Sequence, residues 1–594
     1  MSLSFDFAAL HAAYAAGRRP EETVAEVYAR IKAVGDPGIF IHLRDEAEVT
    51  AEAKALGAFD PEKPLWGLPF AIKDNIDLAG VPTTAACPAY AYTPARDATV
   101  VSELRAAGAL AIGKTNLDQF AAGLVGVRSP YPIPKNSLDP AIVPGGSSAG
   151  SAVAVGHGIV SFALGTDTAG SGRVPAALNN IVGLKPTLGA LSATGVVPAC
   201  RTLDTISIFA LTVADAYAAF QVAARYDQTD AFARAIAASP LVVPPPLSIG
   251  IPNADTIAFF GDAAQAGSFD AALGTLRSIG HQIIPLDFTP FFDVAEMLYG
   301  GAWVAERMTV IEELLRKDPE AVHPVTCEVV SAADALSAAD AFRAIHRLAD
   351  LKRVAEPFLN AVDLLAVPTI PTFYSVADLE ADPITPNSNL GTYTNFVNLM
   401  DLCGIAVPTG MRSDGRPGSL TLLAKDGRDA LCASLATEIH STMAQTMGAT
   451  GCALPERQVL EPGPVPGEIT LAVVGAHMSG LPLNKELTER GARYLETTET
   501  APDYRLYALA GGPPARPGLV RVGEGGRAIV LELWAMPETA LGSFFEGIPA
   551  PLGLGSIALS DGRVVKGFLA EAEGVTDADD ISAFGGWRAY LSSL

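Results

Sequence analysis

Between residues 65 and 187, short apolar runs alternate with stretches rich in small residues. The runs at 69–72 and 109–112 have the length and composition of buried strands, and the stretch at 149–158 has the small-residue pattern of a packed helix. Strands that alternate with helices are typical of an α/β domain. We therefore predict an α/β fold in which helices flank a mixed β-sheet core.

Similar patterns continue on both sides of this segment. Residues 6–34 show two short amphipathic patterns, and the second opens at Pro20 with acidic residues in its first turn, as helices commonly do. A Pro/Thr/Asn-rich stretch ending at Asn389 is longer than ordinary connections, which predicts a long loop that covers a site. Further strands are predicted at 247–251 and 364–368, and further helices at 269–280 and 294–317.

The apolar run from Ile206 to Ala224 approaches the length of a membrane span. Asp215 and Gln221 interrupt it, and its small residues fit a core helix better than a lipid-facing one. We therefore predict a buried helix here and no membrane span.

Between Thr446 and Gly467 the composition shifts to glycine, proline and polar residues, which is typical of a linker. We predict an N-terminal domain over residues 1–446, which includes N-terminal helices in 1–34, then a linker over 447–467 and a C-terminal domain over 468–594. Strands of the second domain are predicted at 469–474, 528–533 and 563–568.

Charge and cysteine usage narrow the function. The 594 residues include 65 acidic and 41 basic side chains, so the net charge of −24 opposes binding to nucleic acid. The six cysteines form no Cys-x-x-Cys pair, which argues against a zinc cage or a dense disulfide framework. The first seven residues lack the basic and apolar regions of a secretory signal, so we expect a cytoplasmic location.

Hydroxyl groups and glycines concentrate in two nearby segments, 145–151 and 165–173. Acyl transfer needs a nucleophile, a proton acceptor and backbone N–H groups aimed at the developing oxyanion, and small residues let the backbone approach the substrate. The two segments therefore predict an acyl-transfer centre. Gly146–Gly150 also matches the nucleophile-elbow pattern with Ser148 as the attacking residue, but the strand that this motif requires before it is missing from the sequence pattern.

The proton acceptor is harder to identify. Eight histidines occur, and the one near the serine-rich segments, His157, lies on a small-residue helix and is interpreted as structural. Lys73 follows an apolar strand, where loss of water favours the neutral amine that accepts protons. A surface lysine at a strand end fits the same pattern, so this segment alone leaves both interpretations open.

Lys73, Ser147 and Ser171 lie in three motifs, 74 and then 24 residues apart, that together resemble the amidase signature family over roughly residues 20–440. The resemblance implies that Ser171 is the nucleophile and that Ser147, held in a cis peptide, relays a proton between Ser171 and Lys73. It implies that no metal or organic cofactor is needed. It also assigns the oxyanion hole to the backbone amides of four consecutive residues, Thr168, Ala169, Gly170 and Ser171.

Other polar residues of these segments are expected to have supporting roles. Asp167 and Arg173 are expected to brace the nucleophile loop. Ser148 and Ser151 lie at a loop-to-helix junction, where their hydroxyls are expected to cap backbone N–H groups.

Residues 113–131, residues 298–307 and the appended C-terminal domain are together similar to allophanate hydrolase. Allophanate is urea with a carboxylate on one nitrogen, so its enzyme must hold that carboxylate while Ser171 attacks the terminal ureido carbonyl. The resemblance assigns this task to Arg307 with the Tyr299 hydroxyl, and a backbone contact to Gly123.

Helix geometry complicates the pairing of Tyr299 with Arg307. Eight positions on a regular helix separate two residues by about 12 Å along the axis. Either Gly300 and Gly301 interrupt the helix or the long arginine side chain reaches back. Without the resemblance, Arg307 would be interpreted as a solvated charge on a helix.

The C-terminal domain is similar to the gamma-glutamyl cyclotransferase-like fold, a small α+β domain with a β-barrel-like sheet. By resemblance it assists decarboxylation of N-carboxycarbamate, with His477 and Glu546 as candidate residues. A strand-end histidine and a loop carboxylate without any catalytic role fit these two residues equally well.

The predicted reaction is hydrolysis of allophanate to ammonia and N-carboxycarbamate, which can lose carbon dioxide. The predicted partners are the small-molecule substrate, a second copy of the chain in a homodimer, and upstream enzymes of the same pathway. A general small-amide amidase and an ammonia-supplying component of an amidotransferase are the alternatives among enzymes. An inactive scaffold in a nitrogen-breakdown complex is the alternative outside them, and the intact Lys73, Ser147 and Ser171 argue against it.

Overall fold

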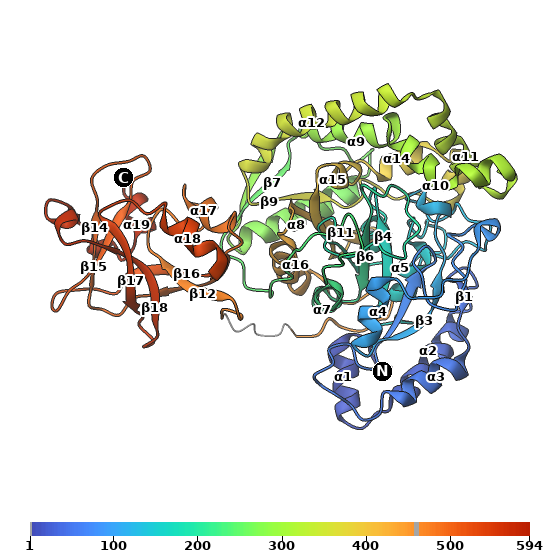
Figure 1. Cartoon of the computed structure of the whole chain (residues 1–594), viewed down its shortest axis with the longest axis horizontal. Helices are drawn as coiled ribbons and strands as arrows, with labels where there is room; N and C mark the ends of the chain where they lie inside the picture. Colours follow the sequence, from blue (N-terminus) through green and yellow to red (C-terminus); the bar gives the residue numbers. More distant parts are fainter. Residues whose placement is uncertain (1–2, 457–462) are drawn as a thin grey trace. The chain divides into compact units, whose positions relative to one another are not determined.

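The computed structural model describes residues 3–456 and 463–594, which form two compact units. The first unit is built from residues 3–240 and 249–456, and the second from residues 241–248 and 463–594. Residues 457–462 of the predicted linker and the first two residues of the chain lie outside the described residues. Figure 1 colours the chain along its sequence and labels its helices and strands.

One large mixed sheet organises the first unit, as predicted. Its strand order is β1-β3-β2-β4-β6-β5-β10-β11-β9-β7-β8. β2 pairs in parallel with β3 and β4, whereas β6 pairs antiparallel with both β4 and β5. The strands of this sheet are β1 (Phe40–Leu43), β2 (Pro69–Lys73), β3 (Leu110–Thr115), β4 (Phe162–Asp167), β5 (Val182–Lys185), β6 (Thr205–Ala210), β7 (Ser248–Pro252), β8 (Gln282–Leu286), β9 (Leu364–Pro368), β10 (Leu402–Met411) and β11 (Pro417–Lys425).

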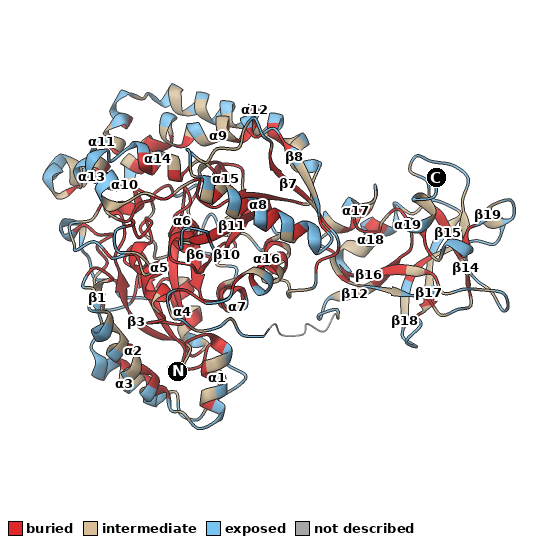
Figure 2. Ribbon diagram, turned by 180° about the vertical axis from the view of Figure 1, so that it is seen from behind, coloured by how far each residue is buried: buried red, intermediate tan, exposed pale blue. Residues whose placement is uncertain are grey.

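Helices surround this sheet, and Figure 2 shows its central strands in the colour of buried residues while the outer sides of the helices are exposed. The helices of the first unit are α1 (Phe7–Ala15), α2 (Pro20–Val34), α3 (Glu46–Ala55), α4 (Thr99–Ala106), α5 (Ala149–Gly156), α6 (Val174–Leu178), α7 (Val213–Ala223), α8 (Ala263–Ser278), α9 (Thr289–Gly300), α10 (Trp303–Lys317), α11 (Pro324–Ser331), α12 (Ala338–Asn360), α13 (Val376–Ala381), α14 (Thr385–Leu390), α15 (Asn395–Leu399) and α16 (Asp429–Met443).

Two of these helices show why the sequence pattern was informative. α2 begins at Pro20 and ends at Val34, and the next residue, Gly35, has a left-handed backbone (φ 62°) that glycine adopts readily. All eight residues of α5 are buried, and the helix packs on β4 and β2. A Cβ atom added to Gly150 would lie 2.2 Å from the carbonyl oxygen of Ile39, so the small residues are what allow this close packing. The packing places the loop before α5 beside the end of β2.

The structure corrects two predictions. The run at 206–224 is not one helix, because Ile206 and Ile208 lie in strand β6 and α7 begins only after Thr212, whose hydroxyl accepts the N–H of Asp215. β-branched side chains favour the strand, and the cap starts the helix. The predicted loop before Asn389 contains two short helices, α13 and α14. Within the described ranges, no helix is both long enough and apolar enough to span a bilayer.

The second unit contains a five-stranded sheet in the order β13-β16-β12-β18-β17 and a three-stranded sheet in the order β15-β14-β19. The edges of the larger sheet meet just beyond β13 and β17, where the N–H of Ala501 donates to Ala558 and that of Ser560 to Glu499. This closure gives the predicted barrel-like form. The elements are β12 (Glu468–Val473), α17 (Asn484–Thr488), β13 (Arg493–Glu499), β14 (Tyr504–Ala508), β15 (Pro517–Arg521), β16 (Val530–Pro537), α18 (Leu541–Phe545), β17 (Leu552–Ala558), β18 (Val564–Ala570), β19 (Asp579–Asp580) and α19 (Trp587–Leu591).

Candidate active site

Lys73 is the last residue of β2, and its side chain is fully buried. Its Nζ atom donates hydrogen bonds to Oγ of Ser147 and Oγ1 of Thr166, each at 2.7 Å. Burial lowers the pKa of Lys73 to about 7, although nearby carboxylates act in the opposite direction. A large fraction of the amine is therefore uncharged near neutral pH. The interpretation of Lys73 as a surface lysine is wrong.

The loop before α5 holds Ser147 against this amine. The Gly146–Ser147 peptide bond is cis. The carbonyl of Ser147 accepts the N–H of Asp118 at 3.0 Å, and the N–H of Gly146 donates to the carbonyl of Leu124 at 2.8 Å. A Cβ atom added to Gly146 would lie 2.1 Å from Oδ2 of Asp118, so only glycine fits at this point of the loop.

Ser171 lies between β4 and α6 in a loop that is braced from within. Asp167 and Arg173 are both fully buried and form an ion pair with Nε and Oδ2 2.9 Å apart. The same carboxylate accepts the N–H groups of Gly170 at 2.9 Å and Gly172 at 3.0 Å. Burial alone would raise the pKa of Asp167, but the Arg173 guanidinium holds it below its ordinary value. The predicted bracing by Asp167 and Arg173 is confirmed.

One N–H group of the predicted oxyanion hole takes part in this bracing. The N–H of Gly170 is already engaged by Asp167, so it belongs to the brace. The other three predicted oxyanion-hole donors, the N–H groups of Thr168, Ala169 and Ser171, do not take part in this bond to Asp167.

A third loop connects the two serine loops. Oγ of Ser171 donates to the carbonyl of Gly123 at 3.4 Å, while the next carbonyl, of Leu124, accepts the N–H of Gly146. The structure therefore gathers the loops of Ser147 and Ser171 on one short backbone segment. The carbonyl of Gly123 contacts the Ser171 hydroxyl, and its predicted contact with a substrate stays a prediction.

The other polar groups near the serines are structural. Oγ of Ser148 donates to the carbonyl of Thr166 at 3.2 Å, and Oγ of Ser151 donates to that of Leu164 at 2.8 Å. Oγ of Ser148 also accepts the N–H of Thr166 at 3.4 Å, so these bonds fasten α5 to β4, and Ser148 caps a backbone N–H of the strand instead of one at the start of α5. His157 lies at the far end of α5 from Ser147.

Tyr299 and Arg307 lie on two different helices, because α9 ends at Gly300 and α10 begins at Trp303. The break allows Arg307 to pack over the Tyr299 ring, with 5.3 Å between Cζ and the ring centroid. Gly301 is needed at the break, since a Cβ atom there would lie 2.4 Å from the carbonyl of Met297. Of the two alternatives left by the sequence, the interrupted helix is the correct one.

Arg307 is a buried cation without a hydrogen-bond partner. Only 4% of the residue is exposed, and within residues 3–456 and 463–594 nothing bonds to its Nε, Nη1 or Nη2 atoms. The interpretation as a solvated helix charge is therefore wrong. A small cavity beside it is lined by Phe120, Ala122, Ala199 and Ile311, among others. Ala122 directly precedes Gly123, whose carbonyl accepts the Ser171 hydroxyl, so this cavity adjoins the loop that contacts Ser171.

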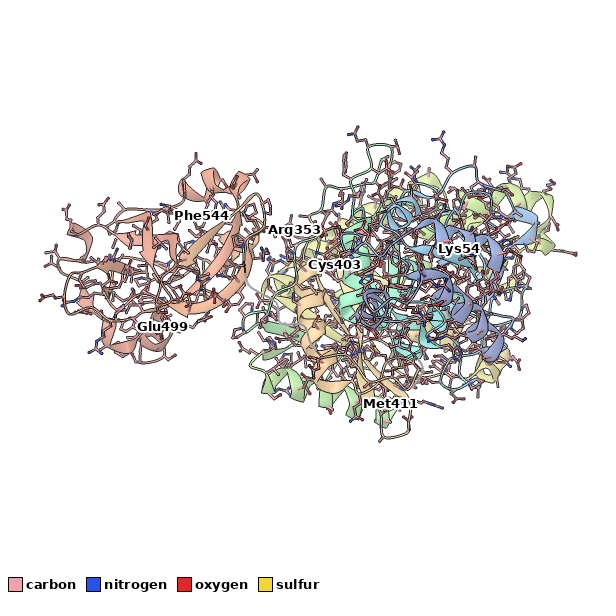
Figure 3. All side chains as sticks on the ribbon, turned by 90° about the horizontal axis from the view of Figure 1, so that it is seen from below. Lys54, Arg353, Cys403, Met411, Glu499 and Phe544 are labelled. Atoms are coloured by element: carbon pink, nitrogen blue, oxygen red, sulfur yellow. The ribbon has the colours of Figure 1, made fainter. Side chains whose placement is uncertain are left out.

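A second cavity lies in the C-terminal unit, with about 550 Å³ of empty space including its open side. His477, Glu486 and Arg516 supply its charged and polar groups, and Phe544, which Figure 3 labels, and Phe568 supply apolar walls. The imidazole of His477 stacks on the Phe568 ring, and its Nε2 atom lies 3.1 Å from Oε2 of Glu486. Burial lowers the pKa of His477, although Glu486 acts in the opposite direction.

The structure does not bring Glu546 to this cavity wall. Glu546 is exposed at the C-terminal end of α18, whereas Glu486 on α17 contacts His477. Sequence reasoning missed Glu486, and it also missed Thr166 as the second partner of Lys73. Thr166 could have been found from its place in the glycine-rich motif, but no local pattern marks Glu486.

Comparisons with known proteins identify the families to which the two parts of the chain are similar. Residues 22–433 match the family model described as Amidase, and residues 469–592 match that of the Allophanate hydrolase C-terminal domain. The chain is 42% identical over 577 residues to the urea amidolyase of Lachancea kluyveri. The matching region covers 94% of this chain but only 31% of that protein. The chain thus spans less than a third of the length of this curated relative.

Two further similarities cover most of the length of the protein compared. The crystallised allophanate hydrolase of Kluyveromyces lactis is 40% identical and matches with a TM-score of 0.78 over 99% of both chains. A glutamyl-tRNA(Gln) amidotransferase subunit of Nitratidesulfovibrio vulgaris is 33% identical over 459 residues, which cover 70% of this chain and 92% of that protein. The chain therefore belongs to the amidase family and carries, after its amidase domain, an allophanate hydrolase C-terminal domain.

Proposed function

We propose that this chain hydrolyses allophanate, with Ser171 as the nucleophile, Ser147 as the proton relay and Lys73 as the base. The buried, partnerless guanidinium of Arg307 is the observation that carries the choice of substrate. A buried charge without a partner is costly, and a bound carboxylate would satisfy its planar fork of donors. Similarity to the allophanate hydrolase of Kluyveromyces lactis over 99% of both chains supports the same substrate.

In the proposed first step, Oγ of Ser171 attacks the terminal ureido carbonyl. Its proton passes through the Ser147 hydroxyl to the neutral amine of Lys73, which accounts for the need to bury this lysine. The N–H groups of Thr168, Ala169 and Ser171 stabilise the oxyanion, and one such donor is typically worth about 10² to 10³ in rate. Protonation of the departing nitrogen by Lys73 releases ammonia and leaves an acyl-enzyme.

In the second step, water attacks the acyl-enzyme carbonyl while Lys73 again accepts the proton through Ser147. The Ser171 hydroxyl is regenerated, and the product is N-carboxycarbamate. The carboxylate bound by Arg307 and Tyr299 keeps the substrate in place through both steps. No step of this scheme assigns a task to a metal or an organic cofactor.

A neutral analogue separates this function from its alternatives. Biuret has an amide where allophanate has its carboxylate, so it tests the role of charge at nearly constant shape. We expect the chain to release ammonia from allophanate with a kcat/KM at least about 10² times that for biuret, because the neutral group leaves the buried cation unpaired. Equal values would favour a general amidase, preferential turnover of glutamine would favour an ammonia-supplying role in an amidotransferase, and no turnover of any amide would favour an inactive scaffold.

We propose a second activity for the C-terminal unit, the decarboxylation of N-carboxycarbamate to carbamate and carbon dioxide. Loss of carbon dioxide leaves an electron pair on nitrogen, which takes up one proton. The cavity beside His477 offers a cation, Arg516, whose Nε has no partner among the described side chains and backbone groups, and an imidazole against apolar rings. An apolar wall disfavours the charge of a carboxylate that is about to leave.

The predicted homodimer and cytoplasmic location rest on the resemblance and on the sequence pattern, and they stay predictions. The proposed place in nitrogen breakdown is supported by the similarity to the urea amidolyase of Lachancea kluyveri.

A further inference from the structure

The carboxylate of Asp204 joins two loops of the candidate active site and has no part in the proposed mechanism so far. The hydroxyl of Thr168 donates a hydrogen bond to its Oδ1 atom. The N–H of Ala199 donates to Oδ2 at 2.7 Å, and the N–H of Cys200 lies 3.1 and 3.2 Å from the two oxygens. A single side chain thus ties the candidate oxyanion segment to the turn at residues 199–204.

The same turn is tied on its other side to helix α10. The carboxylate of Glu306 accepts the N–H of Thr202 at 2.8 Å and its hydroxyl at 2.6 Å. The thiol of Cys200 lies 3.6 Å from the carbonyl oxygen of Trp303. The first turn of α10, which precedes the candidate carboxylate-binding arginine, is therefore attached to the turn that Asp204 holds.

Charge links the two ends of this bridge as well. Asp204 and Arg307 attract one another without a direct hydrogen bond. Burial raises the pKa of Asp204 to about 6, while the Thr168 hydroxyl, the N–H groups of the turn and Arg307 act in the opposite direction. This attraction acts at a distance and leaves the N–H groups of Arg307 without a hydrogen bond among the described residues.

We propose that Asp204 is a positioning residue that fixes the distance between the oxyanion segment and Arg307, and so selects amides with one separation between carboxylate and scissile carbonyl. The inference rests on the proposed function, because it takes Arg307 as the carboxylate site. Allophanate is short and planar, with one nitrogen between the two groups, so it cannot adapt to a shifted site. Misplacement by about 1 Å costs on the order of 10² in rate for such a substrate.

The test uses substitutions that change the bridge without touching the predicted nucleophile. Thr168→Val removes the hydroxyl that donates to Asp204 and keeps the backbone N–H, while Thr168→Ser keeps both. Asp204→Asn weakens the same bridge from the other side. Thr229→Val is the matched control, since this exposed hydroxyl also donates to an aspartate, Asp227, at 2.6 Å.

The readout is kcat and KM for allophanate and for biuret. For Thr168→Val and Asp204→Asn we expect kcat/KM for allophanate to fall at least about tenfold more than for biuret, because only allophanate needs both ends of the site in register. Thr168→Ser should recover most of this loss, and Thr229→Val should leave both values near those of the wild type. Equal losses for the two substrates would overturn the positioning role and leave Asp204 as ordinary support of the loop.

A double-mutant cycle with Arg307→Ala provides the second criterion. Without the guanidinium there is no carboxylate site for Asp204 to align with the oxyanion segment. The additional loss of kcat/KM for allophanate in Thr168→Val should therefore disappear. An extra loss that persists in the double variant would contradict the proposal. If Asp204→Asn fails to fold, the two Thr168 variants carry the test alone, since Thr168→Val removes one hydroxyl.

The outcomes also separate this inference from the proposed function. Wild-type turnover of allophanate with equal losses in the variants would refute the positioning role alone. Turnover of biuret without turnover of allophanate or of malonamate, which places a methylene where allophanate has its nitrogen, would refute the proposed substrate and the positioning role together.

Discussion

Nζ of Lys73 lies 2.7 Å from Oγ of Ser147, and both residues are completely buried. This distance is that of a strong hydrogen bond. In the proposed mechanism the buried amine exchanges protons with this hydroxyl, so that one titrating group serves both serine loops.

The first prediction concerns pH. Burial lowers the pKa of Lys73 to about 7 and the neutral amine is the active form, so activity is lost as pH falls through about 7. We expect kcat/KM to fall about tenfold for each further pH unit on the acid side. The measurement is the pH profile of ammonia release between about pH 5 and about pH 9. A flat acid limb would contradict the role of Lys73, and Lys73→Arg should show no such limb because arginine stays charged.

The second prediction assigns the nucleophile. Ser171→Ala should lower kcat by about 10³ or more, because attack by water must replace attack by the serine. Ser148→Ala is the matched control, because its hydroxyl bonds to backbone groups of Thr166 that link α5 to β4. If Ser148 were the nucleophile, as in an α/β-hydrolase with a nucleophile elbow, Ser148→Ala would lower kcat more than Ser171→Ala. Steady-state kinetics with allophanate compares the two variants directly.

The sequence predicted those residues of the candidate site that lie in short motifs. Lys73, Ser147 and Ser171 each lie in a segment with a recognisable composition of glycine, hydroxyl or apolar residues. Asp204 and Glu486 act through single carboxylates with no local pattern around them. Their roles depend on contacts 36 and 9 residues away, which only the folded chain defines.

The fold, too, was predicted where the sequence carries a clear local pattern. The α/β alternation predicted the mixed sheet, since burial of strands leaves a periodic pattern in the sequence. The run at 206–224 misled because apolar residues continue from strand β6 into helix α7, so that periodicity alone does not separate the two elements. The burial of Arg307 was also missed, because a charged residue on an amphipathic helix normally faces water.

The third prediction tests the cost of an unpaired buried cation. Arg307→Met should nearly abolish the preference for allophanate over biuret, since the carboxylate loses its partner. It should also raise the free energy of unfolding by about 1 to 3 kcal/mol, because a desolvated charge is replaced by an apolar side chain. Chemical denaturation and kinetics measure the two effects.

Arg316→Met is the control on the same helix, since its side chain is 72% exposed. It should change neither the selectivity nor, by more than about 0.5 kcal/mol, the stability. A fall in the stability of Arg307→Met would show that the guanidinium has a structural partner and would contradict its availability to a ligand.

The fourth prediction concerns the loop of Ser147. Gly146→Ala would place a Cβ atom 2.1 Å from Asp118, so the loop must shift and Ser147 must leave Lys73. We expect kcat to fall by about 10² or more. Gly267→Ala in α8 is the control, because nothing lies within 4 Å of its added Cβ atom. This control should gain about 0.5 to 1 kcal/mol of stability and keep its activity. Normal kinetics for Gly146→Ala would exclude the described packing of this loop.

The fifth prediction decides which carboxylate serves the C-terminal cavity. Glu486→Gln removes the charge that lies 3.1 Å from His477, whereas Glu546→Gln changes an exposed residue outside the cavity wall. We expect His477→Ala and Glu486→Gln to slow the release of carbon dioxide from N-carboxycarbamate by about 10² or more, with ammonia release from allophanate unchanged in its first turnover. Glu546→Gln should match the wild type in both measurements. If instead Glu546→Gln slowed carbon dioxide release and Glu486→Gln did not, the active carboxylate would be the one predicted from the sequence, and the cavity beside His477 would not be the site of decarboxylation.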